Sequence, residues 1–131
     1  MSRPLRQASL LAAGLVVLAS CGGGGTPVES GASSPTATGT RVVVTLTEYT
    51  VAPAKRTLAP GTYTFVAEEK GQVPHALSIS GPGVDTESTT VLSPGDQPAE
   101  LTATLKAGTY TLWCPVGTHR QQGMETTVNV S

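Results

Sequence analysis

The segment from Cys114 to Met124 carries a thiol, an imidazole and a thioether at five-residue steps, because His119 lies midway between the two sulfur residues. The one other histidine of the chain, His75, lies upstream. One Cys, two His and a weakly bound Met form the ligand set of a blue-copper electron-transfer site. Apart from the start methionine, Met124 is the only methionine, so these residue types occur as often as such a site requires. The sequence therefore predicts one copper ion bound by His75, Cys114, His119 and Met124.

Other kinds of site fit this donor set less well. Structural zinc takes four Cys, His or carboxylate ligands, and a thioether is a poor ligand for it. Type 2 or trinuclear copper would need several more histidines than the two available, which excludes a self-contained nitrite reductase or multicopper oxidase. An enzyme is not expected, since a Cys114–His119 dyad acting on a substrate would leave His75 and Met124 unexplained.

The first twenty residues have the pattern of a targeting signal. Two arginines precede a short apolar stretch at residues 10–18. This stretch is much shorter than the ~20 residues that a membrane-spanning helix needs. The tetrapeptide Leu18-Ala19-Ser20-Cys21 resembles the lipobox of bacterial lipoproteins, in which the cysteine becomes the lipidated N-terminus. We expect residues 1–20 to be a lipoprotein signal peptide and Cys21 to be the lipid anchor. An ordinary secretory cleavage site followed by a chance cysteine is the alternative.

The use of cysteine agrees with this interpretation. Cys21 and Cys114 are the only cysteines, and in an oxidising compartment they could pair. Four glycines follow Cys21, however, so nothing adjacent would hold it against a sheet. Lipidation of Cys21 leaves Cys114 as a lone thiol outside the cytoplasm, where oxidation threatens it unless a metal binds it. Residues 21–40 are dominated by Gly, Ser, Thr, Pro and Ala and are expected to form a flexible linker.

Residues 41–131 have the length and pattern of one small all-β domain. Short runs rich in Val, Thr, Tyr and Ile alternate between apolar and polar residues, and Gly and Pro interrupt them. This pattern predicts a β-sandwich or barrel with six to eight strands. The expected strands are Arg41–Tyr49, Thr62–Glu68, His75–Ser80, Glu100–Leu105, Thr109–Cys114 and Glu125–Val130, with a weaker one near Thr89–Leu92.

The same alternation places the candidate ligands on the apolar faces of their strands, because residues two apart on a strand share a face. Cys114 is in step with Leu112, His75 is in step with Leu77, and Met124 is in step with the apolar positions of the last strand. Three ligands at strand ends and one in the connecting loop can then converge at one end of a sandwich.

These segments resemble the cupredoxins. The run Gly108–Pro115, followed by His119 and Met124, resembles the C-terminal ligand loop of that family. Its Gly-x-Tyr-x-x-x-Cys approach is similar to that of plastocyanin, and its four-residue gaps are similar to those of rusticyanin-type loops. Lys70–Leu77 resembles the segment that carries the first histidine. The early strands of small bacterial cupredoxin-like lipoproteins are matched by Thr47–Val51 and Pro60–Phe65.

The resemblance extends over residues 41–130 and implies a Greek-key β-sandwich with type 1 copper. His75, Cys114 and His119 would form the trigonal plane, and Met124 would be the weak axial ligand. In this family the loop histidine exposes an edge through which electrons pass, a role that His119 would inherit. A methionine in the axial position, rather than an amide oxygen, favours a relatively high potential.

Two residues depart from the family pattern. The family commonly has an asparagine a few residues before the first histidine, and Glu69 stands at that position here. An ionised carboxylate cannot donate the same hydrogen bond, which puts the bracing of the ligand loop and the potential in doubt. Arg120, next to His119, is more polar than the usual apolar docking patch. It either biases the protein toward an acidic partner or is a solvated loop charge.

The chain is therefore expected to be a monomeric, lipid-anchored carrier outside the cytoplasm that passes single electrons between membrane-associated redox proteins. Without the two leader arginines, six Lys and Arg oppose nine Asp and Glu, a net charge of −3. No basic run occurs, so nucleic acid is not an expected partner. One alternative is a copper-binding or copper-delivery lipoprotein that uses the same ligands. Another is a metal-free structural sandwich in which Cys114 is incidental.

Overall fold

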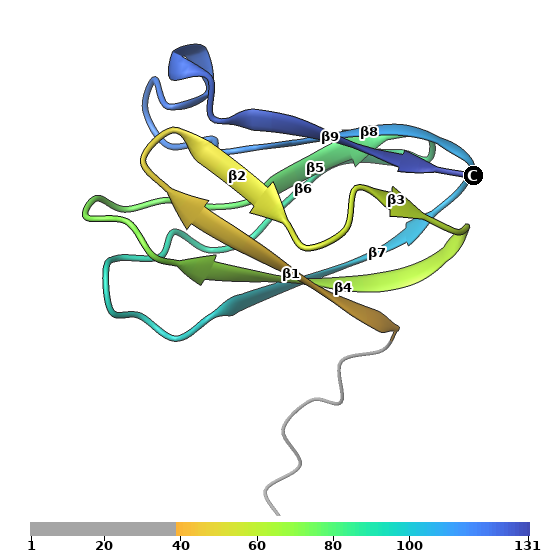
Figure 1. Cartoon of the computed structure of the whole chain (residues 1–131), viewed down its shortest axis with the longest axis horizontal. Coiled ribbons are helices and arrows are strands. Elements are labelled where there is room, and N and C mark those ends of the chain that lie inside the picture. The colour runs from red at the N-terminus through yellow and green to blue at the C-terminus, as the bar shows by residue number, and fades with distance from the viewer. Residues whose placement is uncertain (1–38) are drawn as a thin grey trace, which may run out of the picture. The chain divides into compact units, whose positions relative to one another are not determined.

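The computed structural model describes residues 39–131, which form two β-sheets packed against each other (Figure 1). The predicted signal peptide, the lipidation site at Cys21 and nearly all of the predicted linker lie outside the described residues. The strands are β1 (Thr40–Thr47), β2 (Thr50–Pro53), β3 (Thr57–Leu58), β4 (Gly61–Glu69), β5 (Ser78–Gly81), β6 (Val84–Ser88), β7 (Ala99–Leu105), β8 (Gly108–Trp113) and β9 (Glu125–Val130).

The four-stranded sheet has the order β2-β1-β4-β7, and the five-stranded sheet has the order β3-β9-β8-β5-β6. The β1–β4 and β3–β9 pairs are parallel, and the other pairs are antiparallel. The chain passes repeatedly from one sheet to the other, as in a Greek-key sandwich. The predicted all-β sandwich is therefore confirmed. Among the described residues the only helix is one 3₁₀ turn, η1 (Arg120–Gln122). This part of the chain therefore has no helix that is long and apolar enough to cross a bilayer.

The number of strands is nine rather than the expected six to eight. Sequence reasoning missed β2, β3 and β6, of which β3 has two residues and β6 is mostly exposed. It also extended one strand to Tyr49, where the chain turns back into β2 with a left-handed backbone (φ 57°) at that residue. Left-handed turns are usually marked by Gly or Asn, so a tyrosine gives no such signal.

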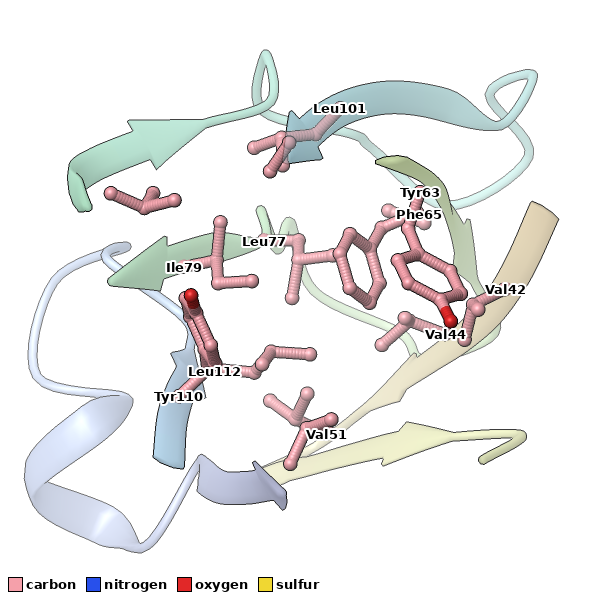
Figure 2. Close-up of a cluster of buried hydrophobic side chains, with 14 of the residues drawn as sticks. Val42, Val44, Val51, Tyr63, Phe65, Leu77, Ile79, Leu101, Tyr110 and Leu112 are labelled. Atoms are coloured by element: carbon pink, nitrogen blue, oxygen red, sulfur yellow. The ribbon is translucent and has the colours of Figure 1, made fainter. Parts of the chain in front are cut away.

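The core lies between the two sheets. Figure 2 shows side chains of β1, β4 and β7 facing those of β5 and β8. The strands alternate as predicted: in β7, Leu101, Ala103 and Leu105 are buried and the residues between them are exposed. Fully burying a large apolar side chain contributes about 1.5–3 kcal/mol. This core holds the strand ends in place without a disulfide among the described residues.

Strand β8, which leads to Cys114, is anchored at its start by a buried tyrosine. The hydroxyl of Tyr110 donates to the carbonyl of Pro82 (2.7 Å) and accepts from the backbone N–H of Lys106 (2.9 Å). The Tyr110 ring also lies where a Cβ on Gly81 would be, 2.4 Å from the nearest ring atom. The start of β8 is thus fixed both to the preceding turn and to β5.

Candidate metal centre

Cys114 directly follows β8 and has no solvent exposure. Tyr110 and Leu112, with which it is in step, are also fully buried, so the predicted inward face is confirmed. The backbone N–H of Cys114 donates to the carbonyl of Met124 (3.1 Å), which extends the β8–β9 pairing by one residue on each strand. Directly paired residues of antiparallel strands lie on the same face. The two sulfur-bearing residues therefore enter the core side by side, and Met124 is fully buried as well.

The loop at residues 115–123 brings His119 back to Cys114. The N–H of His119 donates to the carbonyl of Val116, and the N–H of Met124 donates to the carbonyl of His119, both at 3.1 Å. Gly123 ends η1 with a left-handed backbone (φ 97°), a conformation that glycine adopts without a steric penalty. This tight loop places Nδ1 of His119 3.6 Å from Sγ of Cys114.

His75 reaches the same place from the connection between β4 and β5. It does not belong to β5, as the sequence suggested, but forms an isolated antiparallel bridge with Leu92. The N–H of His75 donates to the Leu92 carbonyl (3.0 Å), and the N–H of Leu92 donates to the His75 carbonyl (2.7 Å). The imidazole of His75 is fully buried, and its ring centroid lies 5.1 Å from that of His119.

The four predicted ligands thus lie at one end of the sandwich, three of them fully buried and His119 half-buried. Between residues 39 and 131, no three His, Cys, Asp or Glu side chains form a ready-made metal-binding cluster. The Cys114 sulfur contacts the His119 ring, the His119 ring lies beside that of His75, and Met124 is paired with Cys114 through the backbone.

A bound metal would resolve the one polar defect of this region. Nε2 of His75 is buried and has no hydrogen-bond partner. No other buried side-chain nitrogen or oxygen of the described residues lacks a partner. Leaving such a group unpaired costs roughly 1–3 kcal/mol. Cys114 is a free buried thiol. A vacant imidazole nitrogen beside a thiol, a second imidazole and a thioether fits a soft metal such as copper.

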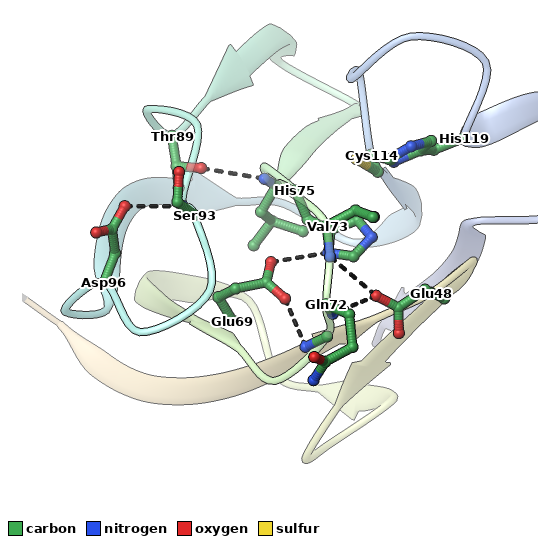
Figure 3. A network of polar contacts seen from close by, with 12 residues as sticks. Glu48, Glu69, Gln72, Val73, His75, Thr89, Ser93, Asp96, Cys114 and His119 are labelled. Atoms are coloured by element: carbon green, nitrogen blue, oxygen red, sulfur yellow. Dashed lines mark hydrogen bonds and ion pairs between the residues drawn. The ribbon is translucent and has the colours of Figure 1, made fainter.

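The other imidazole nitrogen of His75 is held by Glu69, at the end of β4. Nδ1 of His75 and Oε2 of Glu69 lie 2.8 Å apart, and neither side chain has any solvent exposure (Figure 3). The second carboxylate oxygen accepts the backbone N–H of Gly71 at 2.5 Å. Sequence reasoning named Glu69 only as a departure that put the bracing of this loop in doubt. In the structure Glu69 braces the loop as an acceptor rather than as a donor.

A second carboxylate holds the same loop from outside. One oxygen of Glu48, in the β1–β2 turn, accepts the backbone N–H groups of Gln72 and Val73 (Figure 3). These hydrogen bonds, that of Gln72 foremost, lower the pKa of Glu48 from its ordinary value. The next residue, Tyr49, meets the ring of His119 edge-on, with the centroids 5.5 Å apart. Sequence reasoning missed both contacts, because no local pattern marks them.

The charge of Arg120 has partners on the two strands that flank the loop. Its guanidinium carbon lies 4.3 Å from the centroid of the Trp113 ring, and its Nε donates to the carboxylate of Glu125 at 2.5 Å. The sequence left open whether this residue attracts an acidic partner or is a solvated charge. In the structure the half-exposed Arg120 side chain also contacts two residues of the β8–β9 hairpin, and its effect on a partner stays a prediction.

No protein-family model matches the chain, and no curated protein matches it. Several solved structures, in contrast, are similar to it. The dithionite-reduced auracyanin of the photosynthetic bacterium Roseiflexus castenholzii is 18% identical, with a TM-score of 0.58 over 71% of this chain and 98% of the auracyanin. Auracyanin A of Chloroflexus aurantiacus, described as a "blue" copper protein, is 18% identical, with a TM-score of 0.55 over 70% of this chain and 99% of its own. Reduced rusticyanin is 21% identical, with a TM-score of 0.51 over 71% and 81% of the two chains.

These likenesses cover nearly the whole described domain. Residues 39–131 have the cupredoxin fold, which confirms the architecture that the sequence resemblance implied.

Proposed function

We propose that the chain is a type 1 copper protein that carries single electrons, with one copper ion bound by His75, Cys114, His119 and Met124. One observation carries the proposal most directly. A buried, unpartnered imidazole nitrogen lies in the same end of a cupredoxin fold as a free buried thiol, a second imidazole and a buried thioether. Copper bound there would supply reversible one-electron chemistry.

The chain's own residues would keep the site nearly unchanged between oxidation states. Cys114 and Met124 are fixed by the hydrogen bond that extends the β8–β9 pairing, and His75 is fixed by its bridge to Leu92. Residues whose backbone is fixed by such hydrogen bonds would move little when the charge of a bound ion changes. His75, Cys114, His119 and Met124 would hold the ion, with the Met124 thioether as the weakest of the four donors.

His119 is the natural point of entry for electrons. It is the one candidate ligand with appreciable solvent exposure, whereas the other three have none. A redox partner that touches this end of the sandwich would therefore reach the site through the His119 ring, beside the half-exposed Tyr49.

The burial of the other three donors also separates this proposal from its rivals. A copper-delivery protein must release its ion to an acceptor, which requires ligands that the acceptor can approach. A Cys114–His119 dyad acting on a substrate would need an accessible sulfur. Cys114 has no exposure, so both roles are less favoured than electron transfer.

We further propose that Cys21 is lipidated and that the protein is anchored outside the cytoplasm, where it exchanges electrons with membrane-associated redox proteins as a monomer. The support is the lipobox-like sequence before Cys21 and the Gly- and Ser-rich segment that follows it. Two or three acyl chains anchor a protein firmly, whereas one chain binds only marginally.

Electrochemistry of the copper-loaded chain, combined with a competition assay, tests this function. We expect a reversible one-electron couple and retention of Cu(I) in the presence of a moderate Cu(I) chelator. An irreversible couple with rapid loss of Cu(I) to the chelator would instead support copper delivery.

A further inference from the structure

The turn between β1 and β2 has an unusual backbone. Thr47 and Thr50 are paired across this hairpin, so Glu48 and Tyr49 alone make the turn. Tyr49 has a φ of 57° and is the only residue other than glycine with a positive φ between residues 39 and 131. Gly or Asn usually occupies such a position, because a large side chain makes it unfavourable. Residues held in an unfavourable backbone conformation cluster at functional sites, which draws attention to the Tyr49 side chain.

The ring of Tyr49 contacts the one candidate ligand that is not fully buried. It meets the His119 ring edge-on, with the centroids 5.5 Å apart and the ring planes at 79°. The His119 ring also lies beside that of His75, and its Nδ1 lies 3.6 Å from the Cys114 sulfur. Of these three contacts, only that with Tyr49 comes from outside the candidate ligands.

The turn that carries Tyr49 is itself fixed by contacts that do not involve the loop at residues 115–123. Glu48 accepts the backbone N–H groups of Gln72 and Val73 in the β4–β5 connection (Figure 3). The pairing of β1 with β2 continues for four residues on each strand, beginning at the turn. Tyr49 therefore reaches His119 from a support that contains no ligand.

We propose that Tyr49 is a positioning residue that keeps the His119 ring turned toward Cys114 before copper binds. The residues around His119 in its loop, at positions 117, 118 and 120–123, are exposed. Without a neighbour on its outer side the ring could rotate toward solvent, and ordering it on binding would cost conformational entropy. A contact that orders the ring in advance removes this cost from binding. This inference rests on the proposed copper function and adds to it a residue outside the ligand set.

NMR of the full chain without metal tests this role independently of copper. Tyr49→Phe keeps the ring, whereas Tyr49→Asn removes it and keeps a residue that tolerates a left-handed backbone. In the unaltered chain and in Tyr49→Phe, we expect nuclear Overhauser contacts between the two rings and an ordered His119 ring by ¹³C relaxation. In Tyr49→Asn, we expect the order parameter of the His119 ring to fall.

The ring signals can be assigned because the chain has two histidines, so that the His119→Ala variant identifies each of them. An equally ordered His119 ring in Tyr49→Asn would overturn the proposal. A disordered His119 ring in Tyr49→Phe would overturn it as well, because that variant keeps the aromatic contact.

Urea unfolding of the same metal-free variants separates positioning from packing. The side chain of Tyr49 is 40% exposed, and asparagine adopts the left-handed backbone at a lower cost. We therefore expect Tyr49→Asn to unfold at the same urea concentration as Tyr49→Phe or at a higher one. A lower midpoint for Tyr49→Asn would mean that the ring mainly stabilises the fold, which would refute a positioning role.

Copper binding measures the consequence for the site. We expect the Cu(I) affinity of Tyr49→Asn to fall by about 10-fold, as when a residue that orients a metal ligand is lost, and that of Tyr49→Phe to stay unchanged. Thr50→Asn is the matched control, because Thr50 is the next residue and is exposed. Equal affinities in Tyr49→Asn and Thr50→Asn would contradict the proposal. If neither the unaltered chain nor any variant bound copper, the proposed function would fail, while the metal-free spectra would still decide whether Tyr49 orders the ring.

Discussion

Met124 has no solvent exposure and lies opposite Cys114, where the β8–β9 pairing ends. Both sulfur residues are therefore held by one hairpin, while the two imidazoles approach from its loop and from the β4–β5 connection. At the residue scale, the roles of these side chains can be separated by substitutions that alter one donor at a time.

The Met124→Gln variant tests the axial role. An amide oxygen is a harder donor than a thioether and favours Cu(II), so we expect the blue colour to remain and the reduction potential to fall. Redox titration followed by visible absorption measures both. The Asn129→Gln variant, which alters an exposed position of β9, the strand that directly follows Met124, should behave like the unaltered protein. If Met124→Gln changed neither potential nor spectrum, the axial assignment would be wrong.

Cys114, His119 and Met124 could be named from the sequence because they lie at regular steps in one short segment. His75 could be named because it is the only other histidine. Burial of Cys114 and Met124 also follows from the period-two alternation, whereas His75 lies outside the strands, where its neighbours Ala76 and Leu77 are buried as well. The pairing of Glu69 with His75 could not be predicted, because it depends on how the β4–β5 loop folds back over the end of β4.

At the scale of elements, the β1–β2 turn and the β4–β5 connection form one unit. The Glu48 carboxylate joins them by accepting two backbone N–H groups, and Tyr49 of the same turn touches His119. The turn therefore supports one ligand loop through hydrogen bonds and the other through an aromatic contact.

The Glu48→Gln variant should change how stability depends on pH. The N–H groups of Gln72 and Val73 lower the pKa of Glu48 in the folded state. Its stabilisation is complete above the ordinary carboxyl pKa and is lost as the pH falls through the lowered value. We expect the variant to be less stable than the unaltered protein at neutral pH, with the difference shrinking on acidification. Urea unfolding at a series of pH values measures it, with Glu87→Gln on β6 as control. A difference that does not vary with pH would contradict this account.

The Gly81→Ala variant tests the packing that anchors β8. The new methyl group would meet the Tyr110 ring at 2.4 Å, and that ring is fully buried. Overpacking of this kind costs about 1–3 kcal/mol, which chemical denaturation would measure as a lower free energy of unfolding. Ser80→Ala, on the same strand, adds no bulk and is the control. Equal stability of the two variants would show that Tyr110 does not fix the start of β8 as described.

The strands that carry the strongest alternation were also those predicted best. β9 has the expected bounds, β7 begins one residue earlier than expected, and β8 begins and ends one residue earlier than expected. β2 was missed because the turn before it has no Gly or Asn, and β6 because most of its residues are exposed and polar. The pairing of β1 with β4 is parallel, and no local pattern in either strand specifies that choice.

At the scale of the whole molecule, the sequence predicts that a lipid holds the folded domain at a membrane. The Cys21→Ala variant should lose this anchor and appear in the soluble fraction after cell lysis. Fractionation followed by immunoblotting measures the change, and Cys114→Ala, which removes the other cysteine, should remain in the membrane fraction. Continued tight membrane association of Cys21→Ala would count against lipidation.

Stepwise addition of Cu(II) to the full chain, followed by visible absorption, tests the central claim most directly. We expect an intense blue band that saturates at one equivalent of copper and is absent from the Cys114→Ser variant, because the colour requires the thiolate bond. A colourless complex, or a band that persists without the Cys114 sulfur, would contradict the proposed copper centre.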